Sequence, residues 1–299
     1  MWRLGILNTG RLDATEEAWD AFRQGLASLG YHVGHNVLLE FCSAEGDIQQ
    51  LASLAEELVA RAVDIIVAVS APAIRAAKAT TQTIPIVFLL GSDPVRTGLV
   101  ASFDRPGGNA TGLAMMADEF SGMRVEILRE TTPSLRRIGF LWHPDNLGVE
   151  LQLQATIGVA AAHGIGVTVL AARGTADLGR VFESAGLEGV EGITIASDAM
   201  ILGYQAEIAN LVARHRLPSI APSRSYAEAG CLIAFGPSIL EMSRRAAIYI
   251  DRILRGAKPA DLPVERPTKY DFIINLHTAK ALGLTIPPSL LLRADQVIE

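Results

Sequence analysis

The feature that most constrains the fold of this chain is a repeated alternation of short apolar runs with segments of helical periodicity. In the first half, the runs typical of buried strands are Arg3 to Leu7, Val37 to Phe41, Ile65 to Val69 and Ile86 to Leu90. Between them, apolar residues recur at helical spacing over 14–29, 48–62 and 73–80. Continuously apolar strands separated by helices are typical of parallel sheets that are covered on both faces.

The second half of the chain repeats the pattern. Strands are expected at 138–142, 167–170, 193–196, 219–221 and 231–235, with helices at 148–163, 176–186, 200–215 and 238–255. The two series predict an α/β fold with two doubly wound parallel-sheet lobes, which suits a length of 299 residues. The Gly/Pro-rich segment 105–109, followed by 111–115, is the expected boundary. The proline-rich tail from Lys258 suits a segment that runs outside the lobes or crosses between them.

Composition excludes several classes of protein. Hydrophobic residues make up 49% and charged residues 19%, which supports a packed core. The net charge of −6 and the lack of a basic run argue against a nucleic-acid partner. No apolar stretch is long enough for a membrane span. Cys42 and Cys231 lie inside strand-like runs, so we expect two buried, unpaired thiols.

The start of the sequence bears on localisation. Only Met1 and Trp2 precede the first expected strand, so no signal peptide is expected in this sequence. Either the protein is cytoplasmic, or the sequence begins at a mature or engineered start.

Small polar residues follow the expected strands, where doubly wound folds bind their ligands. They occur beside Pro or Gly at 8–10, 70–72, 91–94, 143–146, 197–198, 222–226 and 236–238. Helix N-termini and hydroxyl groups there suit a carboxylate, whereas Asp93 and Asp198 suit an ammonium group. Together they predict a zwitterionic ligand such as an amino acid. The alternative is that these residues only cap the following helices, which applies most strongly to Asp93 before Pro94.

Motifs of nucleotide-binding proteins and hydrolases are absent. The sequence has no phosphate-binding loop, no G-x-G-x-x-G after the first strand, no G-x-S-x-G and no H-E-x-x-H. His143 directly follows a strand, where a solvent-facing or cleft-lining role is favoured over a catalytic one. Trp142, Tyr204 and Tyr226 lie near strand ends of the second lobe, either as packing residues or as walls for an apolar ligand group. We therefore expect no enzyme activity, no catalytic residues, no metal site and no cofactor.

Four segments carry a resemblance to a known family: "GLASLGYHVGHNVLLEF", "LAEELVARAVDIIVA", "TIPIVFLLGSDPVRTGLVASFDRPGGNATG" and "INLHTAKALGLTIPPSLLLRADQVIE". They are similar to substrate-binding proteins of ABC-type importers, in the tryptophan/tyrosine-type family with the type 1 periplasmic binding protein fold. The resemblance extends from Leu4 to Glu299.

The resemblance implies two lobes that are joined by a three-strand hinge and close on a small organic ligand, which we expect to be an amino acid or an aromatic or carboxylate compound. Lobe 1 would comprise 1–115 and 238–265, and lobe 2 would comprise 116–237 and 266–299. Such a protein is a monomer that docks transiently on an ABC permease in the membrane. It is periplasmic or lipid-anchored, so the signal peptide would be missing from this chain. A ligand-sensing domain of the same fold, feeding a receptor or regulator, is the alternative function.

The expected ligand-binding residues come from the strand ends and from the family's cleft-lining positions. They are Asn8, Thr9, Ser70, Ala71, Ser92, Asp93, Asn146, Asp198, Ser223 and Tyr226. Ser70, Ser92 and nearby backbone N–H groups would bind an anionic group, and Asp198 with Asp93 would hold a cation or hydroxyl groups. Asn146 and Ser223 would add hydrogen bonds from the second lobe. Because the loops 143–146 and 223–226 vary in the family, the resemblance does not imply tryptophan as the ligand.

Overall fold

The chain folds into two compact units in a computed structural model that describes residues 1–299, except for the side chains of residues 14, 90, 91 and 147. Gly91, in the strand-end turn singled out above, therefore lies outside the fully described residues. Unit 1 comprises Met1–Met116 and Ser238–Lys269, and unit 2 comprises Ala117–Pro237 and Tyr270–Glu299. The chain thus passes from one unit to the other after Met116, Pro237 and Lys269.

Unit 1 is built on a five-stranded parallel sheet in the order β2-β1-β3-β4-β5. This is one of the common doubly wound orders, in which β1 and β3 lie side by side and end at the same edge. The strands are β1 (Trp2–Asn8), β2 (Val37–Ser43), β3 (Ile65–Val69), β4 (Ile86–Gly91) and β5 (Ala110–Ala114).

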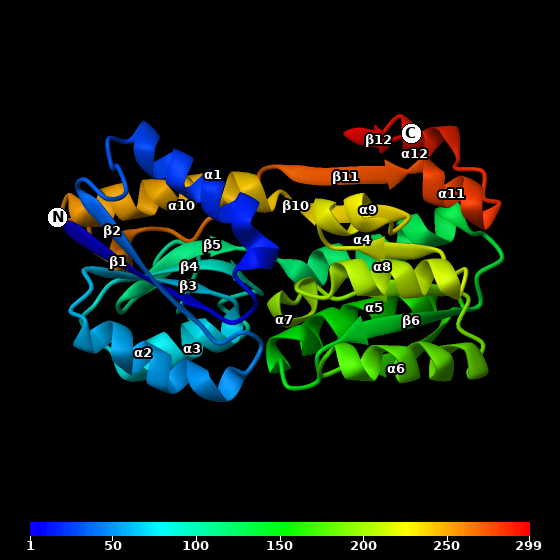
Figure 1. Cartoon of the computed structure of the whole chain (residues 1–299), viewed down its shortest axis with the longest axis horizontal. Coiled ribbons are helices and arrows are strands. Elements are labelled where there is room, and N and C mark those ends of the chain that lie inside the picture. Colours follow the sequence, from blue (N-terminus) through cyan, green and yellow to red (C-terminus); the bar gives the residue numbers. More distant parts are fainter. The chain divides into compact units, whose positions relative to one another are not determined.

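Helices cover both faces of this sheet. In Figure 1, α1 and α10 lie on one face of it and α2 and α3 on the other. The elements are η1 (Asp13–Thr15), α1 (Glu16–Ser28), η2 (Ile48–Gln50), α2 (Leu51–Ala60), α3 (Ala71–Thr80), α10 (Ile239–Leu254) and η4 (Pro259–Asp261).

Unit 2 has a seven-stranded sheet in the order β12-β11-β10-β9-β8-β6-β7. Five of its strands, taken as β7-β6-β8-β9-β10, repeat the strand order of unit 1. The strands are β6 (Arg137–Trp142), β7 (Gly166–Ala171), β8 (Gly192–Ile195), β9 (Ser219–Ala221), β10 (Ile233–Pro237), β11 (Tyr270–Asn275) and β12 (Gln296–Ile298).

The helices of unit 2 pack against the two faces of this sheet in two apolar clusters. One cluster contains α6, α8 and α9 residues such as Phe182 and Tyr226, and the other contains α4, α5 and α11 residues such as Leu128. The helices are α4 (Ala117–Thr131), η3 (Leu147–Val149), α5 (Glu150–Ala162), α6 (Thr175–Leu187), α7 (Ala199–Leu202), α8 (Gln205–Arg214), α9 (Arg224–Ala229), α11 (Leu276–Leu282) and α12 (Pro288–Leu291).

The predicted α/β class is confirmed, with one departure from a purely parallel arrangement. β11 pairs antiparallel with β10, because the chain re-enters unit 2 after Lys269 from the opposite direction. The helix expected over 200–215 is interrupted, since α7 ends at Leu202 and α8 begins at Gln205.

Helix α4 is not predicted from the sequence pattern, because its buried face includes the polar residues Asp118, Ser121 and Arg124. Cys42 and Cys231 are buried and unpaired, as predicted. Among the described residues, no helix is both long and apolar enough to cross a membrane.

The close crossing of α1 and α10 depends on Gly25. A Cβ atom at this position would lie 2.6 Å from the carbonyl oxygen of Arg244, closer than real Cβ atoms approach backbone. Gly158 in α5 has open space around the same position.

We therefore predict opposite effects for two helical Gly→Ala substitutions. Gly25→Ala should lower the free energy of unfolding by about 1–3 kcal/mol, the usual cost of overpacking. Gly158→Ala should leave it unchanged or raise it by up to about 1 kcal/mol, because alanine favours helix. Urea unfolding followed by circular dichroism measures both values, and equal effects at the two positions would contradict the close-packed crossing.

Candidate ligand-binding site

In unit 1, the polar residues after β1 and β3 contact one another. The hydroxyls of Thr9 and Ser70 lie 2.5 Å apart, and the Asn8 side-chain amide donates to the Gly10 carbonyl at 2.7 Å. All three predicted residues are buried, and Ala71 is buried beside them as the first residue of α3. The parallel pairing of β1 with β3 places these residues at one edge of the sheet.

The backbone of Ser70 is strained. Its φ of 83° and ψ of 159° fall in a region that is essentially restricted to glycine. Ser70 occupies the N-cap position of α3, yet its side chain forms no capping hydrogen bond. The Ser70 hydroxyl contacts the Thr9 hydroxyl instead. The backbone strain thus occurs at a strand end that the sequence predicts to bind ligand.

Asp93, by contrast, acts as a cap within its own turn. One of its carboxylate oxygens, Oδ1, accepts hydrogen bonds from the backbone N–H groups of Val95 and Arg96 at 2.9 and 3.0 Å. Both Asp93 and the neighbouring Ser92 are buried. The capping interpretation of Asp93 therefore has direct support.

In unit 2, the turn after β6 is held by its own side chains. The Asn146 side-chain oxygen accepts from the Gly148 N–H at 3.2 Å. Both ring nitrogens of His143 are engaged: Nδ1 accepts from the Asp145 N–H, and Nε2 lies 3.2 Å from the Arg173 carbonyl and donates to it. His143 is buried and has a structural role in this turn.

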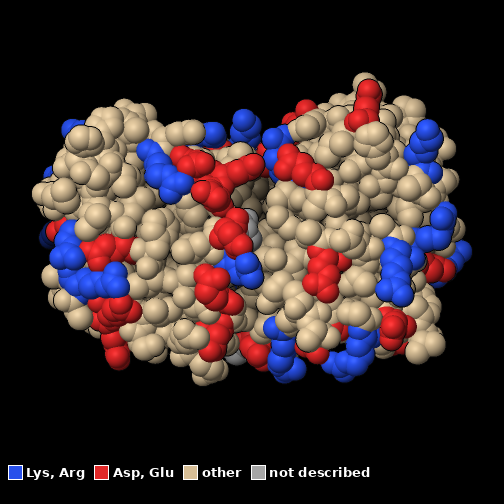
Figure 2. Space-filling view, viewed as in Figure 1, with Lys and Arg blue, Asp and Glu red and all other residues tan. Residues whose placement is uncertain are grey.

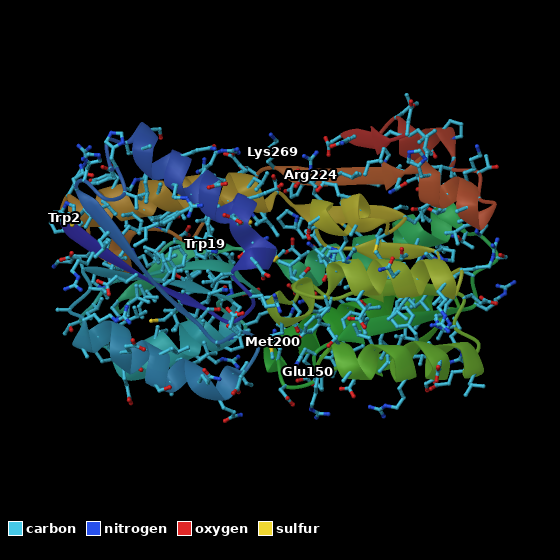
Figure 3. The ribbon with its side chains drawn as sticks, viewed as in Figure 1. Trp2, Trp19, Glu150, Met200, Arg224 and Lys269 are labelled. Atoms are coloured by element: carbon cyan, nitrogen blue, oxygen red, sulfur yellow. The ribbon has the colours of Figure 1, made fainter. Side chains whose placement is uncertain are left out.

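Asp198 combines a capping role with an unused oxygen. Its Oδ1 accepts from the backbone N–H of Met200 at 2.9 Å, at the start of α7, where Figure 3 labels Met200. Its Oδ2 is buried and has no hydrogen-bond partner among the described residues. Burial raises the pKa of Asp198, and this rise is opposed by the Met200 N–H, the Asn146 side chain and His143. A buried carboxylate oxygen without a donor is costly unless a ligand supplies one.

Ser223 and Tyr226 occupy different environments. Ser223 precedes α9, makes no capping bond and lies 3.2 Å from the Ser225 hydroxyl. Tyr226 is fully buried in the apolar cluster with α6 and α8, and its hydroxyl has no partner within the described part of the chain. Burial raises its pKa well above the usual value, so the phenol stays protonated.

Three buried polar residues that the sequence did not single out support the turn after β8. Gln152 donates from Nε2 to the Ser197 carbonyl at 3.1 Å and accepts from the Ser197 N–H at 2.8 Å. Arg124 and Ser121 lie behind it, with the Arg124 Nη2 donating to the Ser121 hydroxyl at 2.7 Å. They lie on helices, away from the strand ends, and periodicity alone does not distinguish them from surface polar residues.

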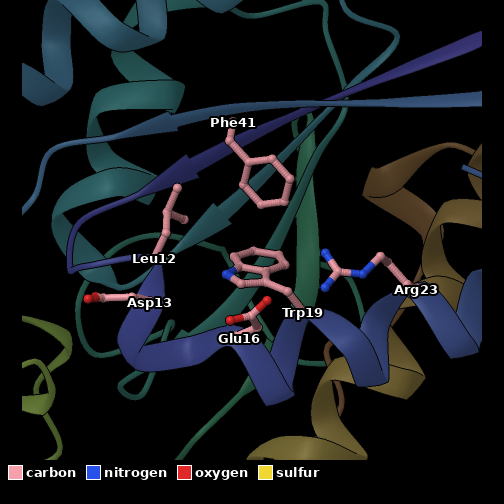
Figure 4. Close-up of a pocket in the computed structure, with 6 residues that line it drawn as sticks. All are labelled: Leu12, Asp13, Glu16, Trp19, Arg23 and Phe41. Carbon is pink, nitrogen blue, oxygen red and sulfur yellow. The ribbon is translucent and has the colours of Figure 1, made fainter. Parts of the chain in front are cut away.

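Unit 1 also has a surface hollow of about 210 Å³ away from these contacts. Figure 4 shows its lining, with the Trp19 and Phe41 rings 5.3 Å apart and nearly perpendicular. Acidic side chains gather over η1 and the first half of α1 in Figure 2, and these two elements carry Asp13, Glu16, Glu17 and Asp20. Every buried polar side-chain atom of the residues lining the hollow has a hydrogen-bond partner. The hollow therefore has no counterpart to the buried, unpartnered oxygen of Asp198.

Two doubly wound units, each with polar residues where its strands end, suit the binding of a small ligand. A family model described as ABC transporter substrate binding protein matches residues 5–298, and the chain belongs to this family. Its members are binding proteins that serve ABC importers. The chain is therefore the solute-binding component of such an importer, with the type 1 periplasmic binding protein fold.

Individual relatives are similar over nearly the whole chain. The Tyrosine-binding protein of Clostridioides difficile (strain R20291) is 25% identical over 282 residues, which are 94% of this chain and 81% of that protein. A conserved domain protein from Vibrio cholerae superimposes with a TM-score of 0.93 at 26% identity, covering 99% of both chains. The ABC domain in complex with L-Trp from Streptococcus pneumonia gives 0.91 at 26% identity, again covering 99% of each.

The strain at Ser70 predicts an unusual order of stability. Ser70→Gly and Ser70→Ala both remove the hydroxyl, but only glycine relieves the positive φ. Ser70→Gly should therefore be more stable than Ser70→Ala by about 1–2 kcal/mol in urea unfolding. At Ser28, the last residue of α1, the alanine variant should be the more stable by up to about 1 kcal/mol. If the alanine variant were the more stable one at both positions, the backbone of Ser70 would not be strained.

Proposed function

We propose that this solute-binding protein captures an α-amino acid, and that the unused carboxylate oxygen of Asp198 binds the ligand's ammonium group. The single observation that carries the proposal is the burial of Asp198 Oδ2 without a donor among the described residues. An ammonium group supplies both a positive charge and hydrogen-bond donors, which are what this oxygen lacks.

Unit 1 supplies groups suited to the opposite end of an amino acid. The hydroxyl groups of Thr9, Ser70 and Ser92 directly follow parallel strands, and Ser70, at the N-cap position of α3, is held in a conformation that costs free energy. Hydroxyls and helix N-termini favour carboxylates. Ser92 and Ser223 would add hydrogen bonds, whereas Asp93 and Asn146 act mainly through the turns that they cap.

The names of two relatives support an amino acid with an aromatic side chain. One is a tyrosine-binding protein, and another was solved in complex with L-Trp. Trp142 and Tyr204 are half-buried aromatic residues close to the strand ends of unit 2 and could line an apolar ligand group. Tyrosine and tryptophan are therefore the first ligands to test.

Binding would shift the protein toward the conformation that holds the ligand, since a ligand stabilises the state that it contacts best. The loaded protein would act as a monomer outside the cytoplasm and dock transiently on the permease of its importer. It would catalyse no reaction.

Isothermal titration with each of the common amino acids tests the proposal. We expect L-tyrosine or L-tryptophan to bind, and we expect the matching acid without an amino group, such as 3-(4-hydroxyphenyl)propionate, to bind at least about 100-fold more weakly. Asp198→Asn keeps the cap and the shape of the side chain but removes its charge. It should therefore weaken the binding of the amino acid by a similar factor.

Asp104→Asn is the matched control, because Asp104 is an exposed carboxylate of unit 1. It should bind like the unaltered protein. Failure of every amino acid to bind, or full affinity in Asp198→Asn, would overturn the proposal.

A further inference from the structure

Arg124 is a fully buried cation whose hydrogen bonds, among the described residues, go to neutral oxygens. Its Nη1 lies 3.4 Å from the Ser197 hydroxyl and 3.3 Å from the Phe235 carbonyl, and its Nη2 donates to the Ser121 hydroxyl. Within that part of the chain, no carboxylate forms an ion pair with it and its Nε has no partner. Burial lowers the pKa of Arg124 to about 9, so the side chain remains charged at neutral pH.

A buried guanidinium without a carboxylate is unusual, because taking a charge out of water is costly unless that charge is paired. Structural stability alone is therefore a poor explanation for Arg124. Arg124 contacts the turn after β8 through Ser197, which directly precedes Asp198.

Three hydrogen bonds, with Gln152 and Arg124, hold Ser197 in place. Gln152 binds both its backbone N–H and its carbonyl, at 2.8 and 3.1 Å, and Arg124 donates to its hydroxyl oxygen. Arginine has donors only, so this contact uses a lone pair of the Ser197 oxygen and leaves the hydroxyl proton free. No described residue accepts that proton in a hydrogen bond, and Ser197 is half-buried rather than enclosed.

We infer that the Ser197 hydroxyl is a ligand-binding donor for a carboxylate oxygen of the ligand, and that Arg124 is the positioning residue that orients it. The turn after β8 would then present an oriented donor and the unused Asp198 oxygen on adjacent residues. Such a pair matches the neighbouring carboxylate and ammonium groups of an α-amino acid. The positive charge behind the hydroxyl makes it a stronger donor and favours an anionic acceptor. This inference rests on the proposed function, and it adds a carboxylate contact from unit 2.

The experiment compares an amino acid with its decarboxylated amine in variants of Ser197. L-Tyrosine and tyramine, or L-tryptophan and tryptamine if tryptophan binds more tightly, are titrated into Ser197→Ala, Ser197→Thr and the unaltered protein. Ser197→Ala should weaken the binding of the amino acid about 10- to 100-fold, because a hydrogen bond to a charged group is lost. The affinity for the amine should stay within about 2-fold of that of the unaltered protein. Ser197→Thr, which keeps the hydroxyl, should bind the amino acid within a few-fold of the unaltered protein.

Arg124→Gln and Arg124→Lys test the positioning role. Arg124→Gln should weaken the binding of the amino acid about 10-fold and leave the binding of the amine unchanged. Arg124→Lys should recover part of the lost affinity, because it restores the charge. A general loss of structure would weaken both ligands alike. If the Arg124 variants do not fold, the Ser197 pair still decides whether the hydroxyl binds the carboxylate.

Two controls keep the outcomes separate. Ser184→Ala and Arg180→Gln alter exposed groups on α6 and should change neither ligand. If the unaltered protein binds amino acids but Ser197→Ala loses affinity for the amino acid and the amine equally, or for neither, only the inference about Ser197 is overturned. If the unaltered protein binds no amino acid, the proposed function fails and this inference fails with it.

Discussion

The constraint on which the rest of the structure depends is the burial of parallel strands on both faces of each sheet. Strands such as Ile65–Val69 are apolar at every position, so the polar residues that follow such a strand lie where it ends. Because parallel strands end at the same edge, these polar groups meet there. In unit 1 the result is the contact between Thr9 and Ser70, and in unit 2 it is the group that includes Asn146 and Asp198.

Buried polar groups at such an edge must find partners, and they do so in two ways. Asp93 and Asn146 accept backbone N–H groups of the turns that follow them. Ser70 and Ser223 sit at N-cap positions without capping, and Asp198 uses one of its two oxygens. The hydroxyls that do not cap and the second oxygen of Asp198 are the groups that we propose for ligand binding.

The sequence predicted β1–β4 and β6–β10, most of the longer helices and the polar strand ends, because these depend on local periodicity and on a topological rule. It did not predict β5, which lies in the expected boundary, or β11 and β12, which lie in the expected tail. Helix α4 was missed, since Arg124 and Ser121 break its apolar pattern while lying inside the protein. Local sequence also could not separate Asp93, which caps through its carboxylate, from Asp198, which keeps a free oxygen. The difference is that the second oxygen of Asp198 is buried without a donor, and burial depends on packing between segments far apart in the chain, which local sequence does not show. Tyr226, expected beside the ligand, packs in the apolar cluster of unit 2, and whether it contacts a ligand remains a prediction.

Unit 2 thus contains two buried charges of opposite sign, Asp198 and Arg124, which form no direct ion pair among the described contacts. The phenol of Tyr226 interacts with both charges, and its own pKa is raised chiefly by burial. In the proposed account these charges are kept apart so that each acts on one end of a zwitterion, Asp198 by contact and Arg124 through Ser197.

A crystal structure of the protein with its amino-acid ligand would show whether Asp198 binds the ammonium group. We expect the ligand's ammonium nitrogen to lie within hydrogen-bond distance, about 3 Å, of Asp198 Oδ2. A complex in which that oxygen binds only protein groups or water, while the ligand's ammonium is held elsewhere, would contradict this expectation.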